Sequence, residues 1–327
     1  MVYLKKGVKS MIDANLIEKL SIVTSEEQTI LDGKKSIDKK IYMENYENIV
    51  SSKKILSSGK QIAIRPHTRF IGFPKHSHDY VEIVFVCKGS VTHIIDQEII
   101  ELHEGELLFL CQNVFHEILP SDVDDIAVNF IVRPEFFDKV IQMMGEEDTP
   151  LRRFILENLK SKNASAGYLL YKVSKVVPVQ NLIENLIYIL LNDTHNKRNV
   201  TQLTMGLLFL NLISFTDKLV SKNVEEQNIV KILGYIENNY KDGSLSELSK
   251  IVHYDISSLS REIKKRTGKK YTDLVSEKRL SQACFMLKNT DMTIEEIANS
   301  VGYNNTSFFY RIFKDKYGCS PKQYKLQ

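Results

Sequence analysis

The chain has 327 residues, of which 43% are hydrophobic and 26% are charged, as in an ordinary globular protein that buries a core. The formal net charge is only +3, which alone excludes no class of partner. Its distribution is more informative, because residues 226–327 carry 17 Lys and Arg against 12 Asp and Glu. A basic C-terminal block suits contact with phosphates, although a solvated helical surface has the same composition.

Several features of the sequence argue against secretion and membrane insertion. The N-terminus lacks the long apolar core of a signal peptide. The most apolar stretch, residues 203–215, is too short to span a bilayer, so we expect a buried helix there. The four cysteines show neither C-x-x-C pairs nor zinc-ligand spacing, which is typical of reduced thiols. We therefore expect a cytoplasmic protein with no membrane association.

The N-terminal half changes its texture near residue 60. Residues 1–60 are polar and rich in lysine, with one weakly amphipathic helix at about 13–22, and we interpret them as a leader or covering segment. Residues 61–133 contain short runs of Val, Ile and Phe separated by turn formers, which predicts a small β-barrel or sandwich. The expected strands are residues 61–65, 81–87, 90–95, 99–102, 107–111 and 126–132.

Residues 134–225 are predicted to form a helical connector. Pro134 and Pro178 stand where helices begin, and apolar residues such as Leu182 and Leu186 follow at helical spacing. Such faces usually pack against the core, and one of them is also a candidate for contact with a second subunit. We therefore expect a homodimer.

The C-terminal region contains an internal repeat. Residues 244–268 align with residues 293–318, with one extra residue in the second copy. Each copy predicts a helix, a short turn and a second helix that ends at Gly268 or Gly318. A helix at residues 271–288, about 25 Å long, joins the copies. This length allows the two second helices to lie about one DNA turn, ~34 Å, apart.

Helix-capping residues recur at equivalent places in both copies. Ser244 and Thr293 each precede a Glu by three residues, which predicts a capping box at the start of each first helix. Asp255 in the first copy, and Asn304 or Asn305 in the second, are suitable N-caps for the second helices.

The second helix of each copy leaves short polar and basic side chains on its open face. A recognition helix places its N-terminal residues against base edges and its flanks against phosphates. Two helical hairpins with solvated outer faces are the alternative, but the turn, the caps and the open face all occur twice, which favours DNA binding. The expected DNA-binding residues are Ser257, Ser258, Arg261, Lys265, Asn305, Thr306, Ser307, Tyr310, Arg311 and Lys314.

Four motifs in this region carry a family resemblance. They are L-S-R-E-I-K-K-R-T-G-K at 259–269, I-A-x-x-V-G-Y at 297–303, F-x-R-x-F-K at 309–314 and G-x-S-P-x-x-Y at 318–324. Residues 229–326 thereby resemble the DNA-binding domain of the AraC/XylS family. The resemblance implies a seven-helix, double helix-turn-helix module that binds double-stranded DNA. His253 departs from the Gly or small residue that this family often has in the first turn, and a tilt of the first recognition helix would follow.

A second motif lies in the predicted barrel. The spacing Gly72-x3-His76-x-His78-x3-Glu82-x6-Gly89 resembles the first metal-binding motif of the cupin superfamily. His116 falls where the histidine of the second cupin motif would be. Three imidazoles and one carboxylate are a donor set for Fe, Mn, Ni or Zn.

Two interpretations of this motif compete. The second cupin motif is degraded, because Cys111-Gln112-Asn113 replaces a turn that carries Pro and Gly. The resemblance to sensory domains of the regulator family favours contact with an organic effector without metal. We therefore expect no cofactor. Arg65, His67 and Arg69 either assist ligand binding or are surface charges, and we favour surface charges. We expect four residues to form the effector pocket, or the ligand set if a divalent metal binds. They are His76, His78, Glu82 and His116.

The sequence thus predicts an α+β protein of two domains, with a cupin-like β-barrel, a helical connector and an all-α, seven-helix double helix-turn-helix domain. The expected divisions are 1–60 for the leader, 61–133 for the barrel, 134–225 for the connector and 226–327 for the DNA-binding domain. The predicted function is a sequence-specific transcription regulator, controlled by a small-molecule effector in the barrel and bound to promoter or operator DNA.

Two alternatives remain beside this prediction. The histidine and glutamate motif supports a metal-dependent cupin enzyme, although no phosphate loop, nucleophile motif or dinucleotide fingerprint accompanies it. An effector-independent regulator, whose N-terminal region only dimerises or binds a protein, is the other.

Overall fold

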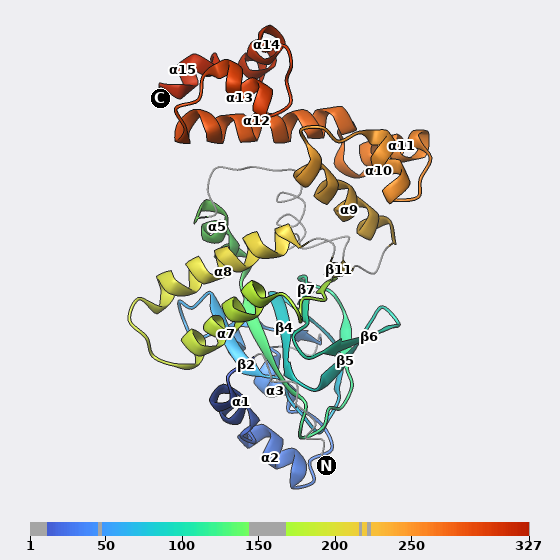
Figure 1. Cartoon of the computed structure of the whole chain (residues 1–327). Helices are drawn as coiled ribbons and strands as arrows, with labels where there is room; N and C mark the ends of the chain where they lie inside the picture. The colour runs from blue at the N-terminus through green and yellow to red at the C-terminus, as the bar shows by residue number, and fades with distance from the viewer. Residues whose placement is uncertain (1–11, 45–47, 144–167, 216–217, 221–223, 327) are drawn as a thin grey trace, which may run out of the picture. The chain divides into compact units, whose positions relative to one another are not determined.

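The computed structural model describes residues 12–44, 48–143, 168–215, 218–220 and 224–326 (Figure 1). The described residues form two compact units, one up to Val220 and the other from Val224 onward. The N-terminal unit is rich in strands and the C-terminal unit is helical, which confirms the predicted α+β class.

Two β-sheets form the strand-rich body of the N-terminal unit, and we refer to these two sheets together as the barrel. The five-stranded sheet has the order β1 (Ile49–Val50), β3 (Phe73–His78), β8 (His116–Ile118), β5 (Ser90–Ile95) and β6 (Glu98–His103). The six-stranded sheet has the order β11 (Leu219–Val220), β10 (Tyr168–Tyr171), β7 (Leu107–Leu110), β4 (Val81–Lys88), β9 (Ile126–Val132) and β2 (Ile62–Pro66). All six predicted strands are present, within a residue at their ends.

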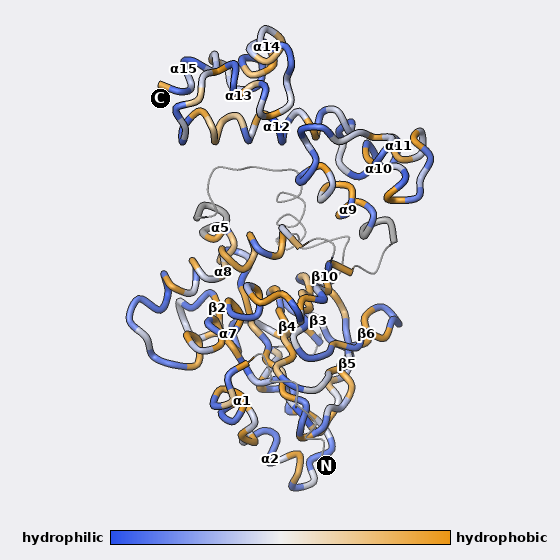
Figure 2. Tube along the Cα trace, viewed as in Figure 1, coloured by the Kyte–Doolittle hydropathy of each residue, from blue (hydrophilic) through white to orange (hydrophobic). Residues whose placement is uncertain are grey.

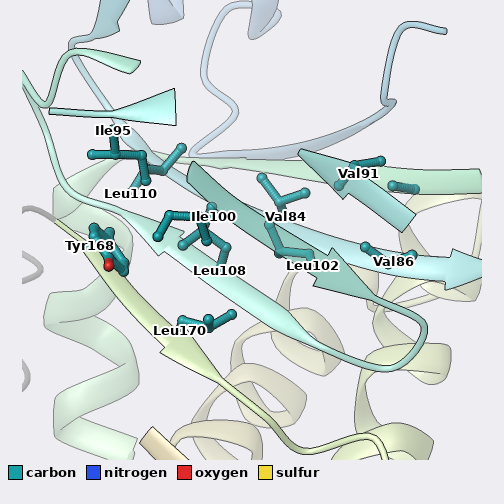
Figure 3. Packing of buried hydrophobic residues seen from close by; sticks show 11 residues of the cluster. Val84, Val86, Val91, Ile95, Ile100, Leu102, Leu108, Leu110, Tyr168 and Leu170 are labelled. Atoms are coloured by element: carbon teal, nitrogen blue, oxygen red, sulfur yellow. The ribbon is translucent and has the colours of Figure 1, made fainter. Parts of the chain in front are cut away.

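An apolar cluster joins the inner faces of the two sheets (Figure 3). It consists of Val84, Val86, Val91, Ile95, Ile100, Leu102, Leu108, Leu110, Ala127, Tyr168 and Leu170. Figure 2 shows the same concentration of apolar residues along central strands such as β4. Because side chains alternate across a strand, Glu82 of β4 and Asn129 of β9 share the inward-facing positions of Val84 and Ala127. The sheet that builds the core therefore also carries polar groups into it.

The described residues before residue 61 are an integral part of this unit. They form α1 (Ala14–Ser21), α2 (Ser25–Leu31), α3 (Lys39–Tyr42), β1 and α4 (Ser52–Ile55), and β1 pairs in parallel with β3. Glu27 of α2 and Arg69 form an ion pair of 2.7 Å whose side chains are only 1% and 3% exposed.

Arg65, which lies on β2, also holds this segment in place. Arg65 contacts the Glu26 carboxylate at 3.3 Å and the Tyr42 hydroxyl at 3.1 Å. The interpretation of Arg65, His67 and Arg69 as surface charges is therefore wrong. His67 and Arg69 are buried, Arg65 is half-buried, and the two arginines anchor the covering segment.

The helices of the connector begin where the prolines predict. Its helices are α5 (Pro134–Met143), α7 (Val177–Leu191) and α8 (Lys197–Ser214). The connector is not only helical, because β10 and β11 extend the six-stranded sheet. The prediction of a buried helix at 203–215 is only partly right. One side of α8 is buried, but Leu203 and Leu207 are each 51% exposed. Within the described ranges, no helix has the length and apolar content to cross a bilayer.

Seven helices form the described part of the C-terminal unit, as the resemblance implies. They are α9 (Val224–Asn239), α10 (Leu245–Ile251), α11 (Ile256–Thr267), α12 (Tyr271–Asn289), α13 (Ile294–Ser300), α14 (Thr306–Tyr317) and α15 (Pro321–Lys325). The repeat corresponds to α10–α11 and α13–α14, and α12 joins them (Figure 1). Gly268 and Gly318 end α11 and α14 in the left-handed conformation, as predicted.

The two first helices are capped differently. At α13 the Thr293–Glu296 capping box is complete, which confirms that prediction. At α10 the Ser244 side chain accepts from the Glu247 amide, but the Ser244 amide donates to the Tyr235 hydroxyl. That hydroxyl in turn donates to the Glu247 carboxylate at 2.7 Å. A tyrosine of α9 has thus inserted into the predicted box and ties α9 to α10.

Candidate functional site

The recognition helices α11 and α14 begin at side-chain caps. The Asp255 carboxylate accepts from the Ser258 amide at 2.9 Å, and the Asn305 side-chain oxygen accepts from the Phe308 amide at 2.9 Å. Leu259 and Ile263 of α11 are fully buried, as are Phe309 and Phe313 of α14. These inward residues fix which face of each helix remains open.

Most of the predicted DNA-binding residues lie on these open faces. The exposed ones are Ser257, Arg261, Lys265, Asn305, Ser307, Arg311 and Lys314. Ser258, Thr306 and Tyr310 are half-buried. Ser258 accepts a hydrogen bond from the Arg261 guanidinium at 3.2 Å, and Tyr310 packs against the core around Phe309. Tyr310 is therefore partly structural.

Sequence reasoning missed two apolar residues and one lysine on the recognition helices. Phe308 and Ile256 are 44% and 49% exposed, and the Arg311 guanidinium lies 5.1 Å from the centre of the Phe308 ring. Exposed apolar side chains at the start of a recognition helix suit contact with thymine methyl groups. Lys264 is exposed and aligns with Lys314 in the repeat, so the repeat itself marks it beside Lys265.

The second candidate site is a cluster of polar side chains between the two sheets of the N-terminal unit. It brings together all four predicted pocket residues. His76 and His78 lie on β3 and His116 on β8, and ligand atoms of the three lie within 4.8 Å of one another. Glu82 of β4 faces them, with Oε2 at 3.6 Å from His78 Nε2 and 3.7 Å from His116 Nε2.

Three further residues extend this cluster and were not predicted as part of it. His93 of β5 lies 5.4 Å from His116 and 5.6 Å from His67, measured between ring centres. Asn129 contacts His67 Nδ1 at 2.9 Å and donates to Glu82 Oε1 at 2.8 Å. The signal was available, because His93 alternates with the apolar residues Val91 and Ile95 and so occupies an inward position of its strand.

Burial keeps the cluster largely uncharged. It lowers the pKa of His67, and it lowers the pKa of His78, His93 and His116 well below the usual value. Burial also lowers the pKa of His76 to about 4 and raises the pKa of Glu82 to about 7. The imidazoles are therefore neutral and can offer lone pairs to a ligand at physiological pH.

Many polar atoms of this cluster have no hydrogen-bond partner within the described chain. They are His67 Nε2, His78 Nδ1, both ring nitrogens of His93 and of His116, and Glu82 Oε2. Each unsatisfied buried polar group costs about 1–3 kcal/mol. A cavity of about 40 Å³ is bordered by His76, His78 and Glu82. The donor set and its unsatisfied atoms fit a divalent transition metal.

Comparison with known proteins identifies both units. The family model described as an AraC-like ligand binding domain matches residues 58–211, and a helix-turn-helix domain model matches residues 248–327. The HTH-type transcriptional activator RhaS of Mannheimia succiniciproducens is 27% identical over 78% of this chain and 90% of its own length. The uncharacterized HTH-type transcriptional regulator YdiP of Escherichia coli is 26% identical over 77% of this chain and 80% of its own length.

Solved structures also align with the chain. ToxT from Vibrio cholerae aligns over 81% of this chain and 96% of its own, with 14% identity and a TM-score of 0.32. The C-terminal domain of the response regulator yesN from Fusobacterium nucleatum aligns over 29% of this chain and 93% of its own, with 33% identity and a TM-score of 0.28.

The protein class follows from the two units and their relatives. A ligand-binding domain followed by a double helix-turn-helix domain defines an effector-controlled, DNA-binding transcription regulator. The chain belongs to the AraC family of transcription regulators. Its relatives are regulators, so the alternative of a metal-dependent enzyme is set aside.

Proposed function

We propose that this regulator acts in the cytoplasm as a homodimer and binds promoter or operator DNA through α11 and α14, while the barrel holds the effector. In this proposal residues 1–60 cover the barrel, 61–133 form most of it, 134–225 add two strands to it and also connect and dimerise, and 226–327 bind DNA. The observation that carries the proposal is the duplicated recognition helix, capped and packed in the same way in both copies, with cations on its open face.

The predicted residues have distinct roles in this proposal. Side chains in the first turn of each recognition helix face base edges, and Phe308 and Ile256 join them as apolar contacts. Arg261 and Arg311 lie one turn further along and reach guanine edges or phosphates. Lys264, Lys265 and Lys314 lie nearer the helix C-terminus, where cations favour phosphate contact.

The proposed dimer uses the exposed side of α8. Val200, Leu203, Leu207 and Leu210 are 38%, 51%, 51% and 39% exposed, and they follow one another at intervals of three, four and three residues. This spacing is typical of the contact stripe between two packed helices. The same stripe on a second copy is the partner that fits it best.

Binding to the DNA upstream of its own gene tests the proposed function. We expect a preference of about a thousandfold over scrambled DNA at physiological salt. Arg261→Ala or Arg311→Ala should weaken specific binding by about 1–3 kcal/mol, because each removes an exposed donor from a recognition helix. Quantitative titrations at several salt concentrations distinguish base contacts from phosphate contacts. Loss of preference at one base pair indicates the former, and a shallower salt slope indicates the latter.

Lys60→Ala is the matched control, because it removes one exposed positive charge from the N-terminal unit. It should leave DNA binding unchanged. An equal loss in Lys60→Ala and Arg311→Ala would show that only net charge matters. Unfolding of Arg311→Ala would show that this residue belongs to the core.

A further inference from the structure

We propose that the effector of this regulator is itself a divalent first-row transition metal ion, held in the barrel by His76, His78, His116 and Glu82. This inference rests on the proposed function and names the ligand class of its effector site. It is carried by the convergence of donor atoms, by their orientation, by the unsatisfied nitrogens and by the size of the cavity.

The four side chains converge from both sheets on one buried point. Each of the three imidazoles is at most 2% exposed, and Glu82 is 4% exposed. The carboxylate oxygen that lacks a partner is the one that faces His78 and His116, at 3.6 and 3.7 Å. Three neutral nitrogens and one carboxylate oxygen form a ligand set that selects transition metals over Mg²⁺ and Ca²⁺.

Neighbouring groups orient these donors. His76 Nδ1 lies 2.9 Å from the carbonyl of Pro74, which can only accept, so the proton is on Nδ1 and the lone pair is on Nε2. Asn129 donates to Glu82 Oε1 at 2.8 Å and leaves Oε2 free to bind. Such outer hydrogen bonds are the usual means by which proteins fix metal ligands.

Three of the four proposed ligands, His76, His78 and Glu82, border a cavity whose size suits an ion with water rather than an organic effector. Its volume is about 40 Å³, whereas sites for drug-sized molecules occupy roughly 300–1,000 Å³. Further nitrogens lie close to the four donors. His93 has both ring nitrogens without a partner in the described chain, and its ring centre is 5.4 Å from that of His116. It is close enough to hydrogen-bond a water ligand of the ion.

The test uses full-length protein that has been stripped with a chelator and then titrated with Co²⁺ or Zn²⁺. We expect one ion per chain, visible Co²⁺ absorption bands, and a rise of several degrees in the thermal midpoint, because only the folded barrel presents the site. The apparent Kd for the upstream DNA should differ by about fivefold or more between the stripped and loaded states.

Conservative variants locate the ion. Glu82→Gln keeps the size of the side chain and should weaken Co²⁺ binding at least tenfold, and His78→Gln should do the same. His103→Gln is the control, because it removes an imidazole that is 58% exposed and distant in sequence from the ligand set. The control should bind Co²⁺ as the original chain does.

Three results would overturn the inference. The metal site is rejected if the protein binds sub-stoichiometric metal with no thermal shift. It is also rejected if Glu82→Gln and His78→Gln bind Co²⁺ as well as the original chain does. Metal binding in the cluster with identical DNA affinity in both states makes the ion structural rather than an effector. The DNA titration is independent of the metal titration. If the protein binds upstream DNA specifically but does not bind metal, only the metal proposal is rejected and the proposed function is retained. If it shows no preference for upstream DNA in either state, the proposed function is rejected together with the effector role.

Discussion

The turn between the two helices of each helix-turn-helix copy contains one residue in the left-handed backbone conformation. In the second copy Gly302 has φ 95°, and a Cβ atom there would lie 2.7 Å from the carbonyl oxygen of Lys241. In the first copy His253 takes the equivalent place with φ 56°, and its side chain is exposed. The first turn therefore accepts a strained side chain, while the second accepts none.

This difference predicts that substitutions at the two positions have different effects on the free energy of unfolding. Gly302→Ala should lower the free energy of unfolding by about 1–2 kcal/mol from conformation alone, and further because of the contact with Lys241. His253→Gly should leave it unchanged or raise it slightly, since the relief of strain opposes the greater freedom of glycine in the unfolded chain. Denaturant titrations of the full chain, followed by circular dichroism, measure both. Equal destabilisation by the two substitutions would contradict this account.

At the scale of elements, a buried ion pair attaches α2 to the barrel. Burial alone would raise the pKa of Glu27, but hydrogen bonds from Arg69 and Thr24 outweigh it and lower that pKa. Arg69 also donates to the carbonyl oxygens of Val123, Ser21 and Ile22. One guanidinium thus connects the covering segment to a loop of the barrel.

Glu27→Gln should therefore lower the free energy of unfolding of the barrel by about 3–5 kcal/mol, because it leaves a buried arginine without its counter-charge. Asp124→Asn is the matched control. It removes a carboxylate from an exposed pair with Lys88 and should have no measurable effect. Thermal denaturation compares the two. A Glu27→Gln protein as stable as the control would mean that the segment is held by apolar packing instead.

The buried histidines predict acid sensitivity of the chelator-stripped protein. Their pKa values are lowered in the fold, so between pH 6.5 and these lower values the unfolded chain binds more protons. Stability should therefore fall as pH drops below about 6.5, by at most about 1.4 kcal/mol per pH unit for each imidazole. Glu82, with a pKa raised to about 7, opposes this trend below pH 7 because the folded chain holds its proton, but it is one group against several.

Thermal midpoints measured at pH 5.5, 6.5 and 7.5 test this sign. The midpoint should drop markedly between pH 6.5 and 5.5. His103→Gln should show the same profile, since that imidazole is exposed. A midpoint that does not change over this range would show that the histidines are already charged or solvated in the folded protein.

Sequence patterns predicted helices and strands well where residues close together in the sequence determine them. The β4, β5 and β9 strands alternate or run apolar, and the capping residues Asp255 and Thr293 marked helix starts correctly. The strand β10 was missed because it is defined by pairing with the distant β7, from Tyr168 to Tyr171 against Leu110 to Leu107. The role of Tyr235 in capping α10 depends likewise on tertiary contact, which no local pattern contains.

The candidate site likewise contains residues that local sequence patterns predicted and residues that they did not. The cupin-like spacing alone was enough to group His76, His78, Glu82 and His116, and the two sheets bring these four side chains together. His67 and Asn129 enter the cluster only because β2 and β9 pair antiparallel, with Arg65 opposite Asn129. The burial of Arg69 was misjudged because its partner, Glu27, lies 42 residues away in a segment without a strong pattern.

At the scale of the whole molecule, DNA affinity depends on how many recognition helices are joined in one particle. A single chain presents two, and a dimer through α8 presents four. Linking binding sites in this way raises overall affinity by about 10²–10⁴ without any new contact, provided that the DNA carries both sites. The exposed stripe on α8 is therefore expected to control operator affinity from a position outside the DNA-binding domain.

The double variant Leu203→Glu, Leu207→Glu tests this expectation, because it places two charges in the centre of the stripe. Both positions tolerate a charge in a monomer, since each side chain is 51% exposed. Light scattering should show a dimer for the original chain and a monomer for the double variant. The monomer should bind an operator with two sites at least tenfold more weakly, yet bind a single site as the original chain does. Ile99→Glu, at a position of β6 that is 68% exposed, is the control and should stay dimeric. A double variant that remains dimeric would place the interface on another face, and a monomer with undiminished affinity for the two-site operator would show that one chain alone accounts for recognition.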